Sequence, residues 1–205
     1  ILCKAGVYFP SAKFTLIRNL TVKGGLAGTD DTTLDPNGER TIIDGENRSD
    51  LSPIFNISAG DPSIFENLEI RNAYLRAFQK TQDGDIKFKN CVFDSCGRQY
   101  TGDVSNERGA AGHFNGAGGA TITYENCIFS RNSYEGNVAT KAVKVGNGIA
   151  LAFTQCKGVI FDNCLFVSNG VGRAALKSST PTGKSISGLR GAVIYAQSPL
   201  TVLNS

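Results

Sequence analysis

Hydrophobic and polar residues alternate in short runs that recur along the chain and end in similar residues. In the fullest copies the alternating run is followed by Asn, Cys, an aliphatic residue and Phe. Alternation with a period of two is typical of a β-strand with one buried face. Asn tolerates left-handed backbone, so it suits a tight bend between two strands. The copies are Ile64–Leu68, Ile86–Phe93, Ile122–Phe129, Val159–Phe166 and Leu200–Ser205.

The spacing between these copies varies, although the copies themselves do not. Successive asparagines are separated by 23, 36, 37 and 41 residues. A fixed unit at variable spacing is typical of a solenoid whose repeats stack on one another and carry excursions of different length. The longer repeats have about 15 residues more than one turn of short strands needs. These residues fall in Gly97–Gly119, Ser133–Gly148 and Gly170–Gly191, which we expect to lie on one face.

The pattern predicts an all-β fold made of stacked repeats. No window longer than about 11 residues keeps helical spacing of apolar residues without Gly, Pro or a β-branched run. Parallel strands about 4.8 Å apart would bury the apolar face of each repeat and pair its backbone with the neighbouring repeats. Like residues would then stack in three structural ladders. The ladders are Asn67, Asn90, Asn126, Asn163 and Asn204 at the bend, with Cys91, Cys127 and Cys164 and then Phe93, Phe129 and Phe166 facing inward.

The length of 205 residues fits a single solenoid domain over residues 1–205. Residues 1–60 are expected to form opening repeats and residues 61–205 the regular ones. The strand-like run Leu200–Asn204 ends soon after it begins. We therefore expect this range to be an excerpt of a longer chain.

Two further motifs carry a resemblance to a known family. The repeats contain FxxN and GGA followed by an aliphatic residue, and both motifs resemble the repeats of the chlamydial polymorphic outer-membrane proteins. The copies are Phe129–Asn132, Phe166–Asn169, Gly118–Ala120 and Gly191–Val193, with departures at Cys96 and Arg190. The resemblance implies a right-handed parallel β-helix of the pectate-lyase type. It also implies a secreted or surface-displayed bacterial protein, since several members of that family mediate adhesion to host cells.

Composition excludes several classes of function. The net charge is +3 and the charged residues are dispersed, which argues against a nucleic-acid partner. The apolar runs are short, as in Ile149–Phe153, so no transmembrane helix is expected. Glycine is unusually frequent, with 24 residues, as turn-rich repeats require.

The six cysteines are interpreted first as small buried hydrophobic residues. A disulfide is the alternative, because stacked repeats bring Cα atoms within the range that such a bond needs. Cys96 and Cys156 lie off the main ladder and are the expected partners in that case. The cysteines lack the spacing of a zinc finger, so no structural zinc is expected.

Candidate chemistry in the sequence is sparse. His113 is the only histidine, and its Gly-rich surroundings predict a loop that serves as a candidate binding site. No cofactor is expected, with Ca²⁺ at Asp30–Asp31 with Asp35, or at Asp83–Asp85, as the alternative. We identify no catalytic residues, because no two carboxylates recur at equivalent positions of neighbouring repeats.

The leading hypothesis is a non-catalytic extracellular β-helix segment of a bacterial surface protein, with an adhesive or rigid-stalk role. Its expected partner is a protein or glycan on host cells or in the extracellular space. The first alternative is a polysaccharide lyase or glycoside hydrolase, because the same fold hosts such enzymes. The second is a structural subunit of a surface filament that associates end to end through its open strands.

Overall fold

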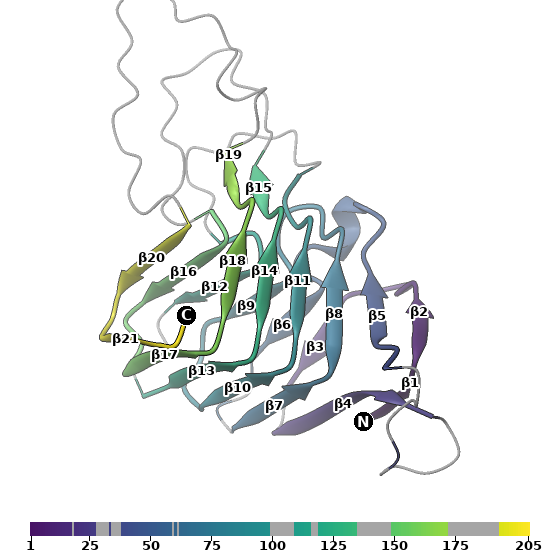
Figure 1. Ribbon diagram of the computed structural model, residues 1–205, viewed down its shortest axis with the longest axis horizontal. Helices are drawn as coiled ribbons and strands as arrows, with labels where there is room; N and C mark the ends of the chain where they lie inside the picture. Colours follow the sequence, from purple (N-terminus) through teal and green to yellow (C-terminus); the bar gives the residue numbers. More distant parts are fainter. Residues whose placement is uncertain are drawn as a thin grey trace, which may run out of the picture.

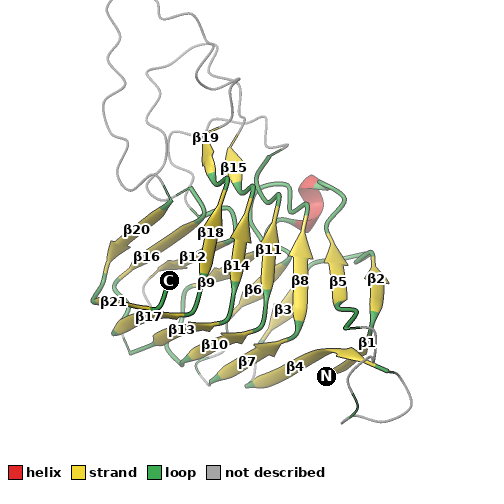
Figure 2. Cartoon of the chain, viewed as in Figure 1, coloured by secondary structure: helices red, strands yellow, loops and turns green. Residues whose placement is uncertain are grey.

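The computed structural model describes residues 1–17, 19–27, 33, 38–58, 60, 62–98, 109–115, 119–134, 149–171 and 193–205. Among these residues the regular structure is β-strand, apart from the three-residue 3₁₀ helix η1 (Ser49–Leu51) (Figure 2). The strands pair in parallel and form three large sheets that run the length of the molecule (Figure 1). The fold is therefore all-β, as the alternating pattern predicts.

The sheets are named by the order in which the chain reaches them. The first sheet contains β1 (Leu2–Lys4), β4 (Leu20–Leu26), β7 (Ser63–Glu66), β10 (Ile86–Lys89), β13 (Thr121–Glu125), β17 (Gly158–Asp162) and β21 (Leu200–Leu203). The second contains β2 (Gly6–Tyr8), β5 (Thr41–Asp44), β8 (Leu68–Arg71), β11 (Val92–Asp94), β14 (Ile128–Ser130) and β18 (Leu165–Val167). The third contains β3 (Phe14–Leu16), β6 (Phe55–Ile57), β9 (Phe78–Lys80), β12 (Gly112–Asn115), β16 (Leu151–Thr154) and β20 (Ile194–Gln197). A small two-stranded sheet pairs β15 (Ser133–Tyr134) with β19 (Gly170–Val171).

The chain passes through the first, second and third sheets in turn and then returns to the first. We call one such passage a circuit. Each strand pairs with the strands at the same place in the previous and next circuits, which is consistent with a parallel β-solenoid. Figure 1 shows the second sheet in front, the first sheet below it and the third sheet behind.

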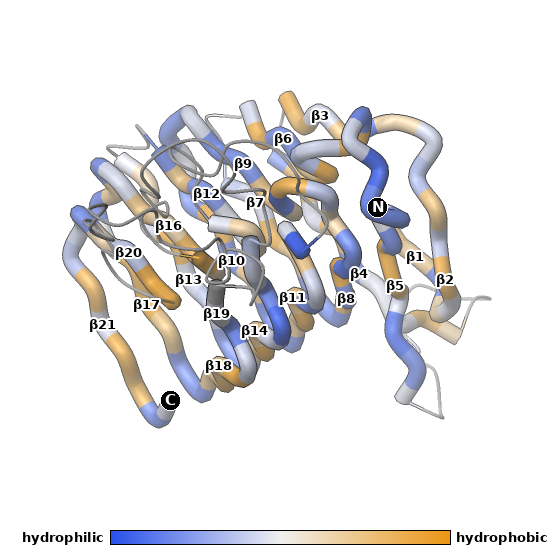
Figure 3. Tube along the Cα trace, turned by 90° about the horizontal axis from the view of Figure 1, so that it is seen from above, coloured by the Kyte–Doolittle hydropathy of each residue, from blue (hydrophilic) through white to orange (hydrophobic). Residues whose placement is uncertain are grey.

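Hydrophobic and hydrophilic residues alternate along these strands (Figure 3). In the first sheet, Phe88 pairs in register with Tyr124, and both rings are buried between the sheets. The next residue, Lys89, pairs with Glu125 on the outer face. Lys89 also forms an ion pair of 3.5 Å with Glu66 one circuit earlier. The period-two pattern thus separates a continuous aromatic core from a solvated face of mixed charge.

The phenylalanine ladder forms the centre of this core. The rings of Phe93 and Phe129 are stacked with centroids 4.9 Å apart, and those of Phe129 and Phe166 with centroids 4.7 Å apart. Tyr124 of the first sheet approaches Phe129 edge-on at 5.2 Å. Stacking within a sheet and edge contacts between sheets are both favourable ring geometries.

One sequence interpretation, the equivalence of the GGA-like copies, needs correction at the corners. Ala120 precedes β13 of the first sheet, whereas Val193 precedes β20 of the third sheet. The GGA-like copies that contain these two residues therefore occupy different corners and are not equivalent repeats. Backbone hydrogen bonds align Ala111 with Ala150, and Ala150 with Val193, so the true equivalents are these three residues before the third sheet.

Candidate functional site

The corner between the first and second sheets is built from the predicted asparagine ladder. Asn67, Asn90, Asn126 and Asn163 each follow a first-sheet strand and have φ between 52° and 56°. Asn204 has φ of 50° after β21. This left-handed conformation turns the chain into the next strand, and Asn adopts it at lower cost than most residues. Side-chain amides are therefore held in a row at one corner.

The thiol ladder lies directly inside this corner. The thiols of Cys91, Cys127 and Cys164 are free, and all three residues are buried. Their S–H groups donate to backbone carbonyls, as Cys127 does to Phe88 at 3.6 Å. A hydrogen bond from the Cys127 thiol lowers the pKa of Cys164 to about 7, while the same contact raises the pKa of Cys127.

The two off-ladder cysteines, named above for the alternative of a disulfide, do not form one. Cys96 follows β11 at the corner between the second and third sheets, whereas Cys156 follows β16 at the corner between the third and first sheets. Both thiols are free. Burial raises the pKa of Cys96 to about 12, so this thiol stays protonated at neutral pH.

The corner between the second and third sheets contains a second asparagine ladder. Asn132 is fully buried and accepts the backbone N–H of Cys96 at 3.1 Å. Its amide nitrogen donates to the Phe93 carbonyl at 3.0 Å and to the Asn169 side chain at 2.9 Å. Asn169 donates in turn to the Phe129 carbonyl at 2.7 Å. The Asn of each FxxN copy thus satisfies backbone groups of the preceding circuit, a structural role that the sequence did not show.

Three long connections begin at this same corner. Residues 99–108, 135–148 and 172–192, which contain most of Gly97–Gly119, Ser133–Gly148 and Gly170–Gly191, lie outside the described residues. The prediction that these three ranges share one face therefore also lies outside them. Their described ends follow β11, β15 and β19 and precede β12, β16 and β20. Each connection joins the second-sheet side of a circuit to a third-sheet strand.

Asp94 lies next to this corner and is hydrogen-bonded to three side chains, one from its own circuit and two from the next circuit. The carboxylate of Asp94 accepts hydrogen bonds from Arg131 at 2.8 Å, Ser130 at 2.5 Å and Ser95 at 3.0 Å. Burial raises the pKa of Asp94, but these hydrogen bonds outweigh that effect, so its pKa lies below the ordinary value. The group is therefore ionised at neutral pH and acts as a structural anion rather than as an acid.

Asp44 lies at the corresponding place two circuits earlier, because it pairs with Arg71, which pairs with Asp94. Its carboxylate accepts hydrogen bonds from Arg71 at 2.7 Å and Asn72 at 3.0 Å. Burial opposes ionisation here too, but the hydrogen bonds lower the pKa of Asp44. Two buried carboxylates thus tie neighbouring circuits together.

Stability is therefore expected to fall in acid. Because folding lowers the pKa of Asp44 and Asp94, their contribution is complete above the unfolded value of about 4 and is lost as pH falls through the lower folded values. Urea unfolding at pH 7 and pH 3 measures this difference. The variant Asp94→Asn should show a smaller acid loss, whereas Asp50→Asn should behave as wild type, because the Asp50–Arg48 pair is exposed. Equal acid sensitivity of Asp94→Asn and wild type would contradict this account.

His113 is not in a loop, contrary to the sequence prediction. It lies in β12 on the outer face of the third sheet, between Gln79 and Ala152 in register. Pairing with strands on both sides overrides the glycine content, since parallel neighbours satisfy the backbone here. The Nδ1 atom of His113 is 3.5 Å from a guanidinium nitrogen of Arg76, which donates to Gln79 at 2.9 Å. The imidazole is half-buried in a polar row rather than presented on a flexible segment.

The candidate calcium ligands are only partly described. Asp30, Asp31 and Asp35 lie outside the described residues. The carboxylates of Asp83 and Asp85 accept the backbone N–H groups of Gly119 and Thr121 at 2.9 Å and 2.7 Å. Within the described ranges, no group of three or more His, Cys, Asp or Glu side chains has the arrangement of a metal site. The same part of the chain contains no helix with the length and hydrophobicity needed to cross a bilayer.

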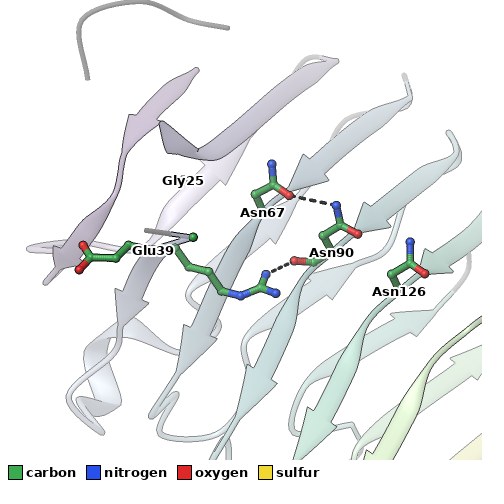
Figure 4. A pocket seen from close by; sticks show the side chains of 7 residues that line it. Gly25, Glu39, Asn67, Asn90 and Asn126 are labelled. Carbon is green, nitrogen blue, oxygen red and sulfur yellow. Dashed lines mark hydrogen bonds between the residues drawn. The ribbon is translucent and has the colours of Figure 1, made fainter. Parts of the chain in front are cut away.

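A polar groove of about 320 Å³ lies on the first asparagine ladder (Figure 4). The described residues that line it are Gly25, Gly38, Glu39, Arg40, Asn67, Asn90 and Asn126. Sequence reasoning identified the three asparagines but missed Glu39 and Arg40, which precede β5 outside any repeat copy. Comparison of the chain with protein families, with curated proteins and with solved structures finds no match. The resemblance drawn from FxxN and GGA therefore gains no support from these comparisons.

Proposed function

We propose that the chain is a right-handed parallel β-helix segment of a secreted or surface-displayed bacterial protein, in which a stiff core holds inserted segments for adhesion. We infer a right-handed coil from the rule that nearly all crossover connections between parallel β-strands are right-handed. Stacked circuits suit a scaffold, because every circuit is fixed by its two neighbours. The function would then belong to the inserted segments, which vary in length while the core does not.

The observation that carries this proposal is that the described residue at the start of each insertion, which we call its base, is hydrogen-bonded to the backbone of another circuit. The backbone N–H of Gly97 donates to Ala73 at 2.8 Å, that of Ser133 to Cys96 at 3.1 Å, and that of Gly170 to Asn132 at 3.0 Å. Each base is thus hydrogen-bonded to the preceding circuit. Gly97 is required here, because with φ of +79° a Cβ atom would lie 2.6 Å from the Ser133 carbonyl oxygen. Segments that start from such anchored points are presented in a fixed order along one corner.

The hydrolase alternative receives less support from the described residues. Asp44 and Asp94, the most buried carboxylates among them, are bonded to arginines and ionised, an arrangement unsuited to a general acid. A lyase or hydrolase activity and end-to-end filament assembly both stay predictions.

Replacement of residues 135–148 by a short Gly/Ser linker tests the adhesive role. We expect the fluorescently labelled variant to keep its β-sheet circular dichroism and to bind cultured epithelial cells at least about tenfold more weakly than wild type. Lys87→Ser is the matched control, because Lys87 lies on the outer face of the first sheet, where the described residues give it an ion pair with half-buried Glu125. Unchanged cell binding after replacement of all three insertions would contradict the proposal.

A further inference from the structure

The groove on the first asparagine ladder is formed by a segment that crosses the ladder. Arg40 precedes β5 in the second circuit, yet its guanidinium donates a hydrogen bond to the backbone carbonyl of Asn90 in the fourth circuit. Figure 4 shows this hydrogen bond as a dashed line to Asn90 and the Glu39 side chain turned away from the row of amides. This contact fixes one wall of the groove without using the asparagine side chains.

Glycine keeps the groove open at the circuit before Asn67. Lys23 pairs with Glu66, so Gly24 takes the place that Asn67 has in the next circuit. A Cβ atom on Gly24 would lie 2.8 Å from the Asn67 carbonyl oxygen, so no other residue fits there. Gly25 has φ of +71° and lines the groove. The asparagine ladder therefore begins at Asn67 with no side chain above it.

The amide row leaves hydrogen-bonding groups unused beside the groove. The Asn90 amide donates to Asn67 at 3.1 Å, and the Asn163 amide donates to Asn126 at 2.7 Å. No side-chain hydrogen bond joins Asn90 to Asn126 in the described part of the chain. The Nδ2 groups of Asn67 and Asn126 and the Oδ1 atom of Asn90 thus have no partner among the described residues. Two donors and one acceptor are held in a line by backbone that cannot easily change conformation.

The charge of the groove selects among ligands. Among the described lining residues, Arg40 carries one positive charge and Glu39 one negative charge, so their formal charges cancel and favour neither an anion nor a cation. The described part of the lining has no aromatic or aliphatic side chain, which a site for an apolar molecule would contain. The side-chain amides both donate and accept hydrogen bonds, so they match groups that do the same, as hydroxyls do.

We propose that this groove binds a neutral glycan through the hydroxyl groups of one or two sugar rings. Its volume of about 320 Å³ lies at the lower end of the range for small-molecule sites. Fixed amides bind at little entropic cost, because their positions are set before the ligand arrives. The site is independent of the insertions proposed for adhesion, since it lies at the other end of the second sheet.

The test is a titration of the isotopically labelled full chain with soluble trisaccharides, observed through the side-chain amide signals of asparagine. The neutral probes are maltotriose, cellotriose, mannotriose and N,N′,N″-triacetylchitotriose, and the anionic probe is trigalacturonate. We expect at least one neutral trisaccharide to shift the signals of Asn67 and Asn126, with a dissociation constant of about 1 mM or below.

Asn126→Gly should weaken this binding at least about tenfold, because glycine keeps the left-handed backbone and removes only the amide. Asn204→Gly is the matched control, since Asn204 has the same conformation but does not line the groove. It should bind within about twofold of wild type.

Three results would overturn the proposal. They are no response to any neutral trisaccharide up to about 10 mM, a stronger response to trigalacturonate than to the neutral probes, and equal weakening by the two asparagine variants. Because the asparagine signals and variants report on the groove, any of these results would leave the adhesive role of the insertions to its own cell-binding test.

Discussion

Phe129→Ala is expected to lower the free energy of unfolding by about 3–5 kcal/mol. The Phe129 ring is fully buried and stacks on both neighbouring circuits, with edge contacts to Tyr124 at 5.2 Å and Phe161 at 6.2 Å. Its removal leaves a cavity whose walls are strands tied into three sheets, so the site cannot collapse to fill it. Urea unfolding at neutral pH measures this loss of free energy. In thermal unfolding, the same loss lowers the midpoint of a chain of this size by about 10 °C.

Phe14→Ala provides the matched control for this ring. Phe14 also faces the core and stacks on Phe55 at 4.9 Å, but it lies in the first circuit and is 39% exposed. Its removal should cost about 1 kcal/mol, because less apolar surface returns to water. Equal costs for Phe14→Ala and Phe129→Ala would contradict the stacked core.

Asn132→Ala is the second substitution with a large expected effect, a loss of about 2–4 kcal/mol. The Asn132 amide serves the Cys96 N–H and the Phe93 carbonyl, both in the preceding circuit. Alanine would leave both backbone groups without their partners, and a buried unsatisfied group costs more than an exposed one. The loss should appear in urea unfolding with little change in the β-sheet circular dichroism.

Asn169→Ala tests how far the stability loss at this corner depends on burial of the amide as well as on its hydrogen bonds. Asn169 donates to the Phe129 carbonyl at 2.7 Å and accepts from Asn132, but it is only half-buried. Water can replace part of what its side chain provides, so we expect a smaller loss than for Asn132→Ala. If Asn132→Ala unfolds within about 0.5 kcal/mol of wild type, the amide does not hold this corner.

The repeated parts of the fold could be predicted because each carries its own local signal. Asn90 adopts left-handed backbone with φ of 53°, and the alternating residues before it form a strand with one buried face. The same local rules act at Asn126 and Asn163, so stacking follows once one circuit is correct. The aromatic residue that pairs with Phe88 is Tyr124, which the alternation also places inward.

The parts that sequence reasoning missed depend on contacts between distant segments. His113 was predicted in a loop from its glycine neighbours, but strands β9 and β16 on either side fix it in a sheet. Arg40 lies outside the repeat copies, and only the folded chain brings it to Asn90. The role of Asn132 was hidden because its backbone partners belong to the preceding circuit.

The two proposed sites lie at opposite ends of the second-sheet strands. The asparagine groove is at the corner where the chain enters this sheet, and the three insertions begin where it leaves. A solenoid can carry both, because each corner repeats along the axis without disturbing the other. Loss of glycan binding and loss of cell binding are therefore separable by the variants described above.

A crystal structure of the full chain tests the central claim, the in-register stacking of successive circuits, most directly. The account predicts parallel rings with centroids 4.9 Å apart for Phe93 and Phe129 and 4.7 Å apart for Phe129 and Phe166. Rings in separate parts of the molecule, beyond the roughly 7 Å of aromatic contact, would contradict it.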